Sequence, residues 1–237
     1  MKSHRENNES CPICGAPIHY IDYQVFMTCE ICGRSFMSNS RCENGHFVCD
    51  ECHSKKSLDI LIGKCAAMDS SNPLEIEDAL FREKAVHMHG PEHHTIAGAA
   101  VLTAYRNAGG NLDLSKALRE MISRGRQVPG GTCGFWGCCG AALSCGIALS
   151  IIEGITPLSE EPWGAANMLT SRILAELARY GGPRCCKRVS YLAATVTAAF
   201  IEERLGVSMS LPENHKCSFH ENNNECLGIK CPFFPGV

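Results

Sequence analysis

Apolar residues after about residue 54 follow the spacing of α-helices, and the alternation typical of strands is scarce beyond residue 47. Residues three and four positions apart in such a pattern fall on one face of a helix, where they can be buried together. The pattern therefore predicts an all-helical bundle. The expected helices cover residues 72–87, 93–107, 113–124, 138–153, 163–180 and 183–204.

Capping and breaking residues define the ends of several of these helices. Asn72 followed by Pro73 is typical of a helix start, and Asp113 is placed to cap the third helix. Glycine pairs at 109–110 and 181–182 separate neighbouring helices. The segment 139–146 consists almost entirely of small residues, which predicts a central helix that its neighbours approach closely.

The first 56 residues contain four closely spaced pairs of metal-ligand residues. Two pairs lie in the sequences CPICG and CEICG, where glycine lets the backbone turn tightly around an ion. A strand-poor segment of this length cannot fold on apolar burial alone, so we expect metal ions to stabilise it. Eight ligands predict two structural zinc ions in tetrahedral sites. The pairs are Cys11 with Cys14, Cys29 with Cys32, Cys42 with His46, and Cys49 with Cys52.

Spacing alone leaves two ways to share these four pairs between the ions. In sequential pairing, the third and fourth pairs bind one ion within eleven residues, which is a cramped arrangement. The run from Cys29 to Cys52 resembles the first six ligands of a RING finger, and the upstream pair can replace the missing last pair. In that cross-brace arrangement, the first and third pairs bind one ion, and the second and fourth pairs bind the other. We favour the cross-brace pairing.

Charge and composition exclude several classes of function. The 237-residue chain has 22 basic and 25 acidic residues, and neither this balance nor that of the first 56 residues provides the basic surface that nucleic acid or an anionic membrane requires. Residues 1–10 are polar, unlike a signal peptide, and the longest apolar run, 141–152, is shorter than the ~20 residues of a membrane span. We expect a cytoplasmic protein whose 17 cysteines serve as metal ligands rather than disulfides.

Cysteine and histidine residues also gather just before three predicted helices, in the sequences HGPEHH, GGTCGFWGCCG and GGPRCCKR. The dipole and free N–H groups of a helix start favour thiolates, so the pKa of these thiols should be lowered. Helix starts at one end of a bundle can meet, which predicts one pocket that holds a metal, a cluster or a redox pair. The catalytic candidates are Cys138, Cys139, Cys185 and Cys186 as nucleophiles, with His93 or His94 as acid or base. The cofactor-binding candidates are His89, Cys133 and Arg184.

The C-terminal tail adds three cysteines, in the pattern Cys217-x8-Cys226-x4-Cys231-Pro232. A cysteine followed by proline occurs in iron–sulfur ligation, so these residues are further cofactor-binding candidates. Three thiols need a fourth ligand, which Cys65, Cys133 or one of the vicinal cysteine pairs can supply. The alternative is a tail that zinc holds in place or that carries free thiols.

Four of these motifs resemble an uncharacterised cysteine-rich domain family, a domain of unknown function. They are CENGHFVCDECH, HGPEHH, VPGGTCGFWGCCGAA and GGPRCCKR, and the resemblance extends over most of the chain from about Cys42. That family is also found fused or adjacent to radical-SAM and methyltransferase domains, which implies a partner of that kind. A weaker similarity links Cys139, Cys185 and Cys186 to the helical redox-associated family named for a C-GCAxxG-C-C pattern. Here a histidine, His93 or His94, stands where that family's first cysteine is expected.

We therefore expect a two-zinc module over residues 1–56, a helical domain over 57–210 and a cysteine-rich tail over 211–237 packed on it. The leading hypothesis is a metal- or iron–sulfur-bearing accessory protein for redox chemistry, sulfur or metal handling, or cofactor assembly. A thiol-dependent enzyme is the second hypothesis, and a zinc-finger interaction adaptor is the third. The glycine-rich loop 128–137 can offer N–H groups to an anion, but no nucleotide-binding motif accompanies it. Self-association into a homo-oligomer fits each hypothesis.

Overall fold

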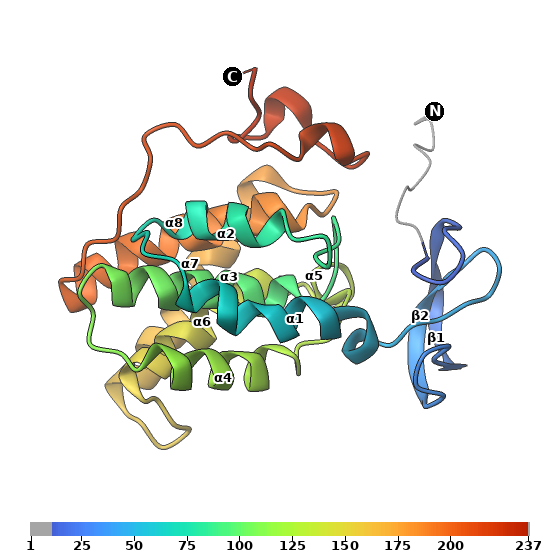
Figure 1. The fold of residues 1–237 in the computed structure, drawn as a ribbon, viewed down its shortest axis with the longest axis horizontal. Helices are drawn as coiled ribbons and strands as arrows, with labels where there is room; N and C mark the ends of the chain where they lie inside the picture. Colours follow the sequence, from blue (N-terminus) through green and yellow to red (C-terminus); the bar gives the residue numbers. More distant parts are fainter. Residues whose placement is uncertain (1–10, 237) are drawn as a thin grey trace.

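The computed structural model describes residues 11–236 as a helical bundle with a two-stranded hairpin beside it (Figure 1). The polar segment 1–10, on which the argument against a signal peptide rests, lies outside the described residues. The hairpin consists of β1 (Ile18–Thr28) and β2 (Ser35–Cys42). The described residues form eight α-helices: α1 (Asp50–Ala66), α2 (Pro73–Phe81), α3 (His93–Asn107), α4 (Leu114–Gly125), α5 (Thr132–Phe135), α6 (Gly140–Glu153), α7 (Glu161–Tyr180) and α8 (Cys186–Leu205).

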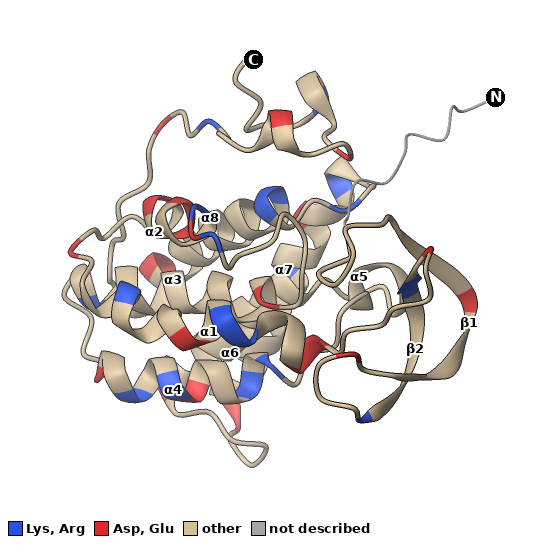
Figure 2. Ribbon diagram, turned by 45° about the vertical axis from the view of Figure 1, so that its right-hand side comes forward, with Lys and Arg blue, Asp and Glu red and all other residues tan. Residues whose placement is uncertain are grey.

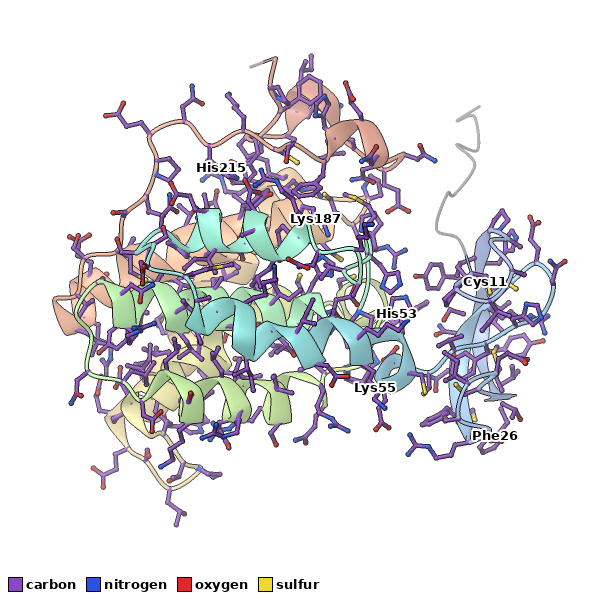
Figure 3. The ribbon with its side chains drawn as sticks, viewed as in Figure 1. Cys11, Phe26, His53, Lys55, Lys187 and His215 are labelled. Atoms are coloured by element: carbon purple, nitrogen blue, oxygen red, sulfur yellow. The ribbon has the colours of Figure 1, made fainter. Side chains whose placement is uncertain are left out.

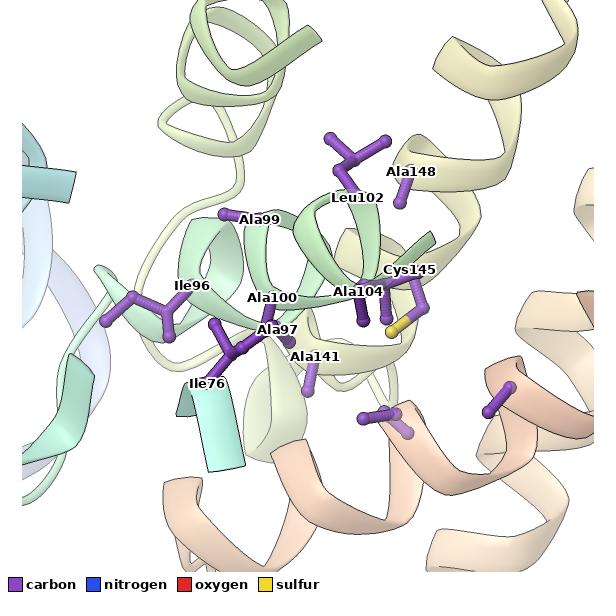
Figure 4. Close-up of a cluster of buried hydrophobic side chains, with 14 of the residues drawn as sticks. Ile76, Ile96, Ala97, Ala99, Ala100, Leu102, Ala104, Ala141, Cys145 and Ala148 are labelled. Atoms are coloured by element: carbon purple, nitrogen blue, oxygen red, sulfur yellow. The ribbon is translucent and has the colours of Figure 1, made fainter. Parts of the chain in front are cut away.

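Helix α3 is the centre of the bundle, and α1, α2, α4, α6 and α8 all contact it. Twelve of its fifteen residues are buried, and its one charged residue beyond the histidines is Arg106 near the end. A helix that is apolar on every side is stable only when other helices surround it. Figure 4 shows Ala104 of α3 beside Cys145 of α6, and Leu102 beside Ala148.

Small residues allow α3 and α6 to pack backbone against backbone. The Gly98 N–H group donates a hydrogen bond of 2.8 Å to Ser144 Oγ, and a Cβ added at Gly98 would lie 2.6 Å from the Ser144 carbonyl oxygen. The close approach predicted for segment 139–146 is therefore present. It brings the start of α3, with its histidines, beside the start of α6.

The N-terminal module is not strand-poor, and this expectation was wrong. β1 and β2 pair as an antiparallel hairpin, with an irregularity in the register between Tyr20 and Val25. Burial alternates over residues 25–29, but exposed positions there include the apolar Phe26, so the sequence shows no alternation of apolar and polar residues. A small apolar cluster holds the strands together, in which Met27 of β1 and Phe36 of β2 pack with Phe47 and the buried ligand Cys29.

Several helix ends differ from those predicted. Helix α2 ends at Phe81 rather than near residue 87, because residues 82–92 turn back towards the hairpin side of the bundle. The glycine-rich loop contains the one-turn helix α5, and α8 begins at Cys186 rather than 183. Helix α1 runs without a break across the boundary predicted after residue 56. Within residues 11–236, no helix combines the length and apolar character needed to cross a bilayer.

The tail after α8 folds back over α2 and α8 (Figure 1). It begins with a hydrogen bond of 3.1 Å from the Ser210 N–H group to the Ser71 carbonyl. Further along, Phe233 packs edge-on against Tyr191 of α8, and Phe219 against Phe81 of α2. The tail cysteines therefore lie close to the start of α8. Figure 2 shows acidic and basic residues mixed along the elements of the ribbon.

Candidate metal centres and the cavity beside them

Two groups of four ligands lie in the N-terminal module, and in each group the ligand atoms are within 4.8 Å of one another. The groups are Cys11, Cys14, Cys42 and His46, and Cys29, Cys32, Cys49 and Cys52. This is the cross-brace pairing, and sequential pairing is wrong. The hairpin explains the result, because β1 carries the chain from the first pair to the second and β2 brings it back.

The distances within both groups fit a single tetrahedral ion. Two thiolates bound to one zinc ion at about 2.3 Å are about 3.8 Å apart. The Sγ atoms of Cys14 and Cys42 are 3.9 Å apart, and so are those of Cys32 and Cys49. Backbone N–H groups donate hydrogen bonds to the sulfurs, as Ile13 does to Cys11 at 3.4 Å. Both groups can therefore hold a metal ion.

Two of these cysteines are prepared as thiolates. The backbone at Ala16 and the side chains of Asn44 and His46 lower the pKa of Cys14 to about 6. The Arg34 side chain and backbone lower the pKa of Cys32 to about 6. The two thiols with a lowered pKa belong to different groups, so each group offers an ionised ligand near neutral pH.

A third group of thiols, which we call the tail cluster, joins the helical domain to the tail. Cys185 lies at the start of α8, and it shares a small pocket with Cys217, Cys226 and Cys231. The sequence left several residues as the fourth member of this group, and the structure places Cys185, from the vicinal pair at 185–186, with the three tail cysteines. The two cysteines of this pair point to different places, because Cys186 lines a separate cavity.

Each thiol of the tail cluster accepts hydrogen bonds from N–H groups. The donor lies two residues further along for Cys217 (Phe219 N, 3.4 Å) and Cys226 (Gly228 N, 3.4 Å). The backbone N–H groups of Phe233 and Phe234 donate hydrogen bonds to the Cys231 sulfur. Cys185 accepts from the Arg188 N–H group at 3.4 Å and from Asn223 Nδ2 at 3.3 Å. These donors are arranged to stabilise negative charge on sulfur.

Burial nevertheless opposes ionisation of three of these thiols and raises the pKa of Cys185, Cys217 and Cys231. Burial, together with repulsion from Cys231 and Cys226, raises the pKa of Cys185 even though Arg188 opposes the shift. Burial raises the pKa of Cys217 to about 11. At these three thiols the N–H donors do not outweigh burial, and a bound cation would favour the thiolate forms.

A cavity of ≈ 790 Å³ lies between the module and the helical domain. Its walls combine hairpin residues with the start of α1, the loop before α3 and the start of α8. Five of the residues predicted to share one pocket line it: His89, His94, Cys133, Arg184 and Cys186. The structure therefore places these five candidates around one cavity.

The remaining candidates lie elsewhere. His93 is buried inside the bundle, where its ring nitrogens contact Lys187 Nζ at 2.8 Å and the Gly90 carbonyl at 3.0 Å. Cys138 and Cys139 are not among the residues that line the cavity, and Cys185 belongs to the tail cluster. The single site expected from the sequence is therefore two neighbouring sites.

The expectation of lowered thiol pKa values at the helix starts was wrong. Burial raises the pKa of Cys138, of Cys139 to about 11, and of Cys186. At these positions the loss of water around the thiolate outweighs the stabilisation by the helix start. A nucleophilic role for these thiols has no support from their ionisation.

Asn223 connects the two sites. Its Nδ2 group donates to Cys185 Sγ in the tail cluster, and its Oδ1 atom accepts from His89 Nε2 at 3.2 Å on the cavity side. His89 in turn accepts from the Cys186 N–H group at 3.4 Å. Burial and the nearby Arg184 charge lower the pKa of His89 to about 4, so its ring is neutral at physiological pH.

A further set of ligand residues escaped the sequence reasoning. His53, His87 and Glu92 offer ligand atoms that all lie within 4.8 Å of one another at the edge of the cavity. Burial opposes ionisation of Glu92, but interactions with His53 and His87 hold the pKa of its carboxyl well below the usual range. No regular spacing connects these residues, although Glu92 stands inside HGPEHH and His53 follows the ligand Cys52.

Comparison with known proteins bears on the helical part of the chain. A family model described as a family of unknown function, DUF5714, matches residues 61–234, about three quarters of the 237 residues. The chain belongs to this family. No curated protein and no solved structure matches it.

The DUF5714 segment contains the tail cluster and most of the helical bundle. It also contains His87 and Glu92, whereas His53 and the eight ligands of the module precede it. The resemblance predicted from the motifs is thereby confirmed for residues 61–234.

Proposed function

We propose that this protein binds an iron–sulfur cluster through Cys185, Cys217, Cys226 and Cys231, and that zinc occupies the two sites of its N-terminal module. In this proposal it acts as an accessory protein in redox chemistry or cofactor assembly. The observation that carries the proposal is the meeting of four cysteines, from α8 and the tail, around one pocket in which N–H groups face every sulfur.

The spacing of these thiols supports a cluster rather than a single ion. In both module sites, all four ligand atoms lie within 4.8 Å of one another. Within residues 11–236, no tail-cluster thiol belongs to a group of three or more ligand atoms that are this close together. A cluster with four cysteine ligands separates its sulfurs more widely, since they bind different iron atoms. N–H donors to the sulfurs are a known means of setting a cluster's reduction potential.

The surroundings of the pocket also suit a cluster. Its walls include Met88, Tyr191, Leu227 and Phe233, which limit the access of water. Arg188 is buried beside Cys185, and its guanidinium donates to the Gly181 and Pro183 carbonyls at 2.9 Å. This fixed positive charge offsets part of the negative charge of four thiolates. When bound, the cluster would supply one-electron redox chemistry, and the protein would supply its four ligands and its shielding.

A partner enzyme of the radical-SAM or methyltransferase class belongs to this proposal as the source or recipient of electrons or of the cofactor. The support for it is the motif resemblance described above. The net charge of -3, with acidic and basic residues mixed along the elements in Figure 2, favours a protein partner over nucleic acid.

Anaerobic preparation of the full chain tests the cluster. Protein purified without oxygen, or reconstituted with iron and sulfide, should bind both elements and show broad sulfur-to-iron absorption that bleaches on reduction. Cys217→Ser and Cys231→Ser should lose the absorption and most of the iron. Cys133→Ser is the matched control, because Cys133 is exposed in α5 and outside the tail cluster. Zinc in place of iron at the tail cysteines after reconstitution, or equal iron in all variants, would refute the proposal.

A further inference from the structure

His53, His87 and Glu92 meet at the edge of the large cavity although they come from three separate segments. His53 lies in the first turn of α1, His87 in the loop after α2, and Glu92 immediately before α3. Figure 3 shows His53 on the end of α1 that faces the hairpin. We propose that these three residues form a third metal site, which binds one divalent first-row transition metal ion and leaves coordination positions open towards the cavity.

The distances suit a single ion. Nitrogen and oxygen ligands at about 2.1 Å from a metal are about 3.0 Å apart in octahedral geometry and about 3.4 Å apart in tetrahedral geometry. The His87 Nδ1 atom is 3.2 Å from Glu92 Oε1, and the His53 Nδ1 atom is 3.5 Å from Glu92 Oε2. The two imidazole rings lie with centroids 4.0 Å apart. An ion can therefore bind between the three side chains with little movement.

The Glu92 carboxylate is oriented towards this point and is incompletely satisfied. Its side chain is fully buried, and the His87 N–H group donates to Oε1 at 3.0 Å. The partner of Oε2 is His53 Nδ1, and the 3.5 Å between them is too long for a strong hydrogen bond. A buried carboxylate oxygen that is so weakly bonded is costly unless a cation is near it.

The backbone leaves room for this carboxylate. A Cβ added at Gly90 would lie 2.1 Å from Oε2 and 2.7 Å from Oε1 of Glu92. Gly90 therefore allows the chain to turn closely around the carboxylate, and any other residue there would displace it. The glycine of HGPEHH is explained by this contact rather than by a turn alone.

The identity of the ligands indicates the class of metal. Two imidazoles and one carboxylate with open positions are typical of non-haem Fe(II) sites and also suit Mn(II), whereas thiolate groups select zinc or iron–sulfur clusters. His53 and His87 both line the cavity, so a small molecule entering it can reach the open positions. This site uses none of the thiols of the proposed iron–sulfur cluster, so the two proposals stand or fall separately.

Mn(II) is the probe that distinguishes this site from the thiolate sites. We expect the full chain, with its zinc sites filled, to bind about one equivalent of Mn(II), measured as loss of the free-ion EPR signal. His87→Ala and Glu92→Gln should each weaken this binding at least tenfold. His94→Ala and Glu225→Gln are matched controls, because both residues line the same cavity outside the triad, and they should bind as the parent protein does.

Folding is checked separately, by circular dichroism and zinc content. His87 is the more informative position if Glu92→Gln fails to fold, since its side chain is 40% exposed and its removal leaves the core intact. Absence of a bound equivalent in the parent protein would overturn the proposal. Mn(II) binding that persists unchanged in a folded His87→Ala variant, or that falls equally in His94→Ala, would overturn it as well.

Discussion

Replacing Gly98 with alanine should force apart the two helices at the centre of the bundle. The new Cβ would lie 2.5 Å from Met121 Sδ and 2.6 Å from the Ser144 carbonyl oxygen. The methionine can rotate away, but the carbonyl belongs to the backbone of α6 and moves only with that helix. Overpacking of this kind costs about 1–3 kcal/mol, and distortion of the Gly98–Ser144 hydrogen bond adds about 1 kcal/mol.

The substitution also stabilises the helix, and this gain must be subtracted from the cost of overpacking. Alanine is favoured over glycine inside a helix by about 1 kcal/mol. The net loss in the free energy of unfolding is therefore about 1–3 kcal/mol, which for a chain of this size lowers the melting temperature by roughly 2–12 °C. Thermal unfolding followed by circular dichroism at constant metal content measures it.

Gly164 supplies the matched control. It lies in α7, and an added Cβ would meet no atom within 4 Å. Gly164→Ala should therefore raise the free energy of unfolding by about 0.5–1 kcal/mol. If Gly98→Ala proves as stable as Gly164→Ala, the close backbone contact between α3 and α6 does not have the energetic role assigned to it.

Three other predictions follow from the sites and the core. Chelation should unfold the N-terminal module, and Cys49→Ala should do the same with loss of one zinc ion. Cys65→Ala, in the bundle core, should lower the free energy of unfolding by only roughly 1–3 kcal/mol and keep both ions. Equal zinc loss in the two variants would contradict the assignment. Cys185→Ser should abolish iron binding on reconstitution while Cys186→Ser retains it, which iron and sulfide analysis distinguishes; the reverse order would move the site into the cavity. Burial raises the pKa of Glu77 well above 4.5, so above about pH 4.5 the folded state holds a proton that the unfolded state loses. The free energy of unfolding should therefore fall as pH rises above about 4.5, by up to about 1.4 kcal/mol per pH unit. Urea unfolding at pH 5 and pH 7 should show a smaller decrease for Glu77→Gln than for the parent protein, and parallel behaviour would show that the carboxyl is not kept protonated.

Local signals in the sequence were sufficient for the helices and the module ligands. Helix α3 occupies 93–107 as predicted, because a continuous run of apolar residues and the glycine pair that follows it mark its bounds in the sequence. The ligand pairs could be located because zinc knuckles repeat a short local pattern. The hairpin could not, because residues such as Tyr23 and Phe26 are exposed, at 70% and 78%, and leave no alternation to detect.

The helical-domain sites depended on contacts between distant segments. The sequence offered a vicinal cysteine pair as one source of the fourth thiol of the tail cluster. It could not show that Cys185 joins the tail cysteines while Cys186 lines the cavity. That separation follows from the direction in which the first turn of α8 points each side chain. His53, His87 and Glu92 carry no common spacing, and only the turn of residues 82–92 towards α1 brings them together.

Helix α1 links the N-terminal module to the bundle, and its first turn lines the cavity between them. It begins at Asp50, between two ligands of one module site, and ends at Ala66 after burying Leu61 and Cys65 in the bundle. Asp50 Oδ2 accepts a hydrogen bond of 2.6 Å from the Gly130 N–H group, and Glu51 pairs with Arg126 at 3.2 Å, so its first turn is also fastened to the opposite wall. Because Cys49 and Cys52 belong to one ligand group of the module and Leu61 packs in the bundle, the helix acts as a spacer between the two. A metal ion bound at that group would therefore anchor the spacer at its module end.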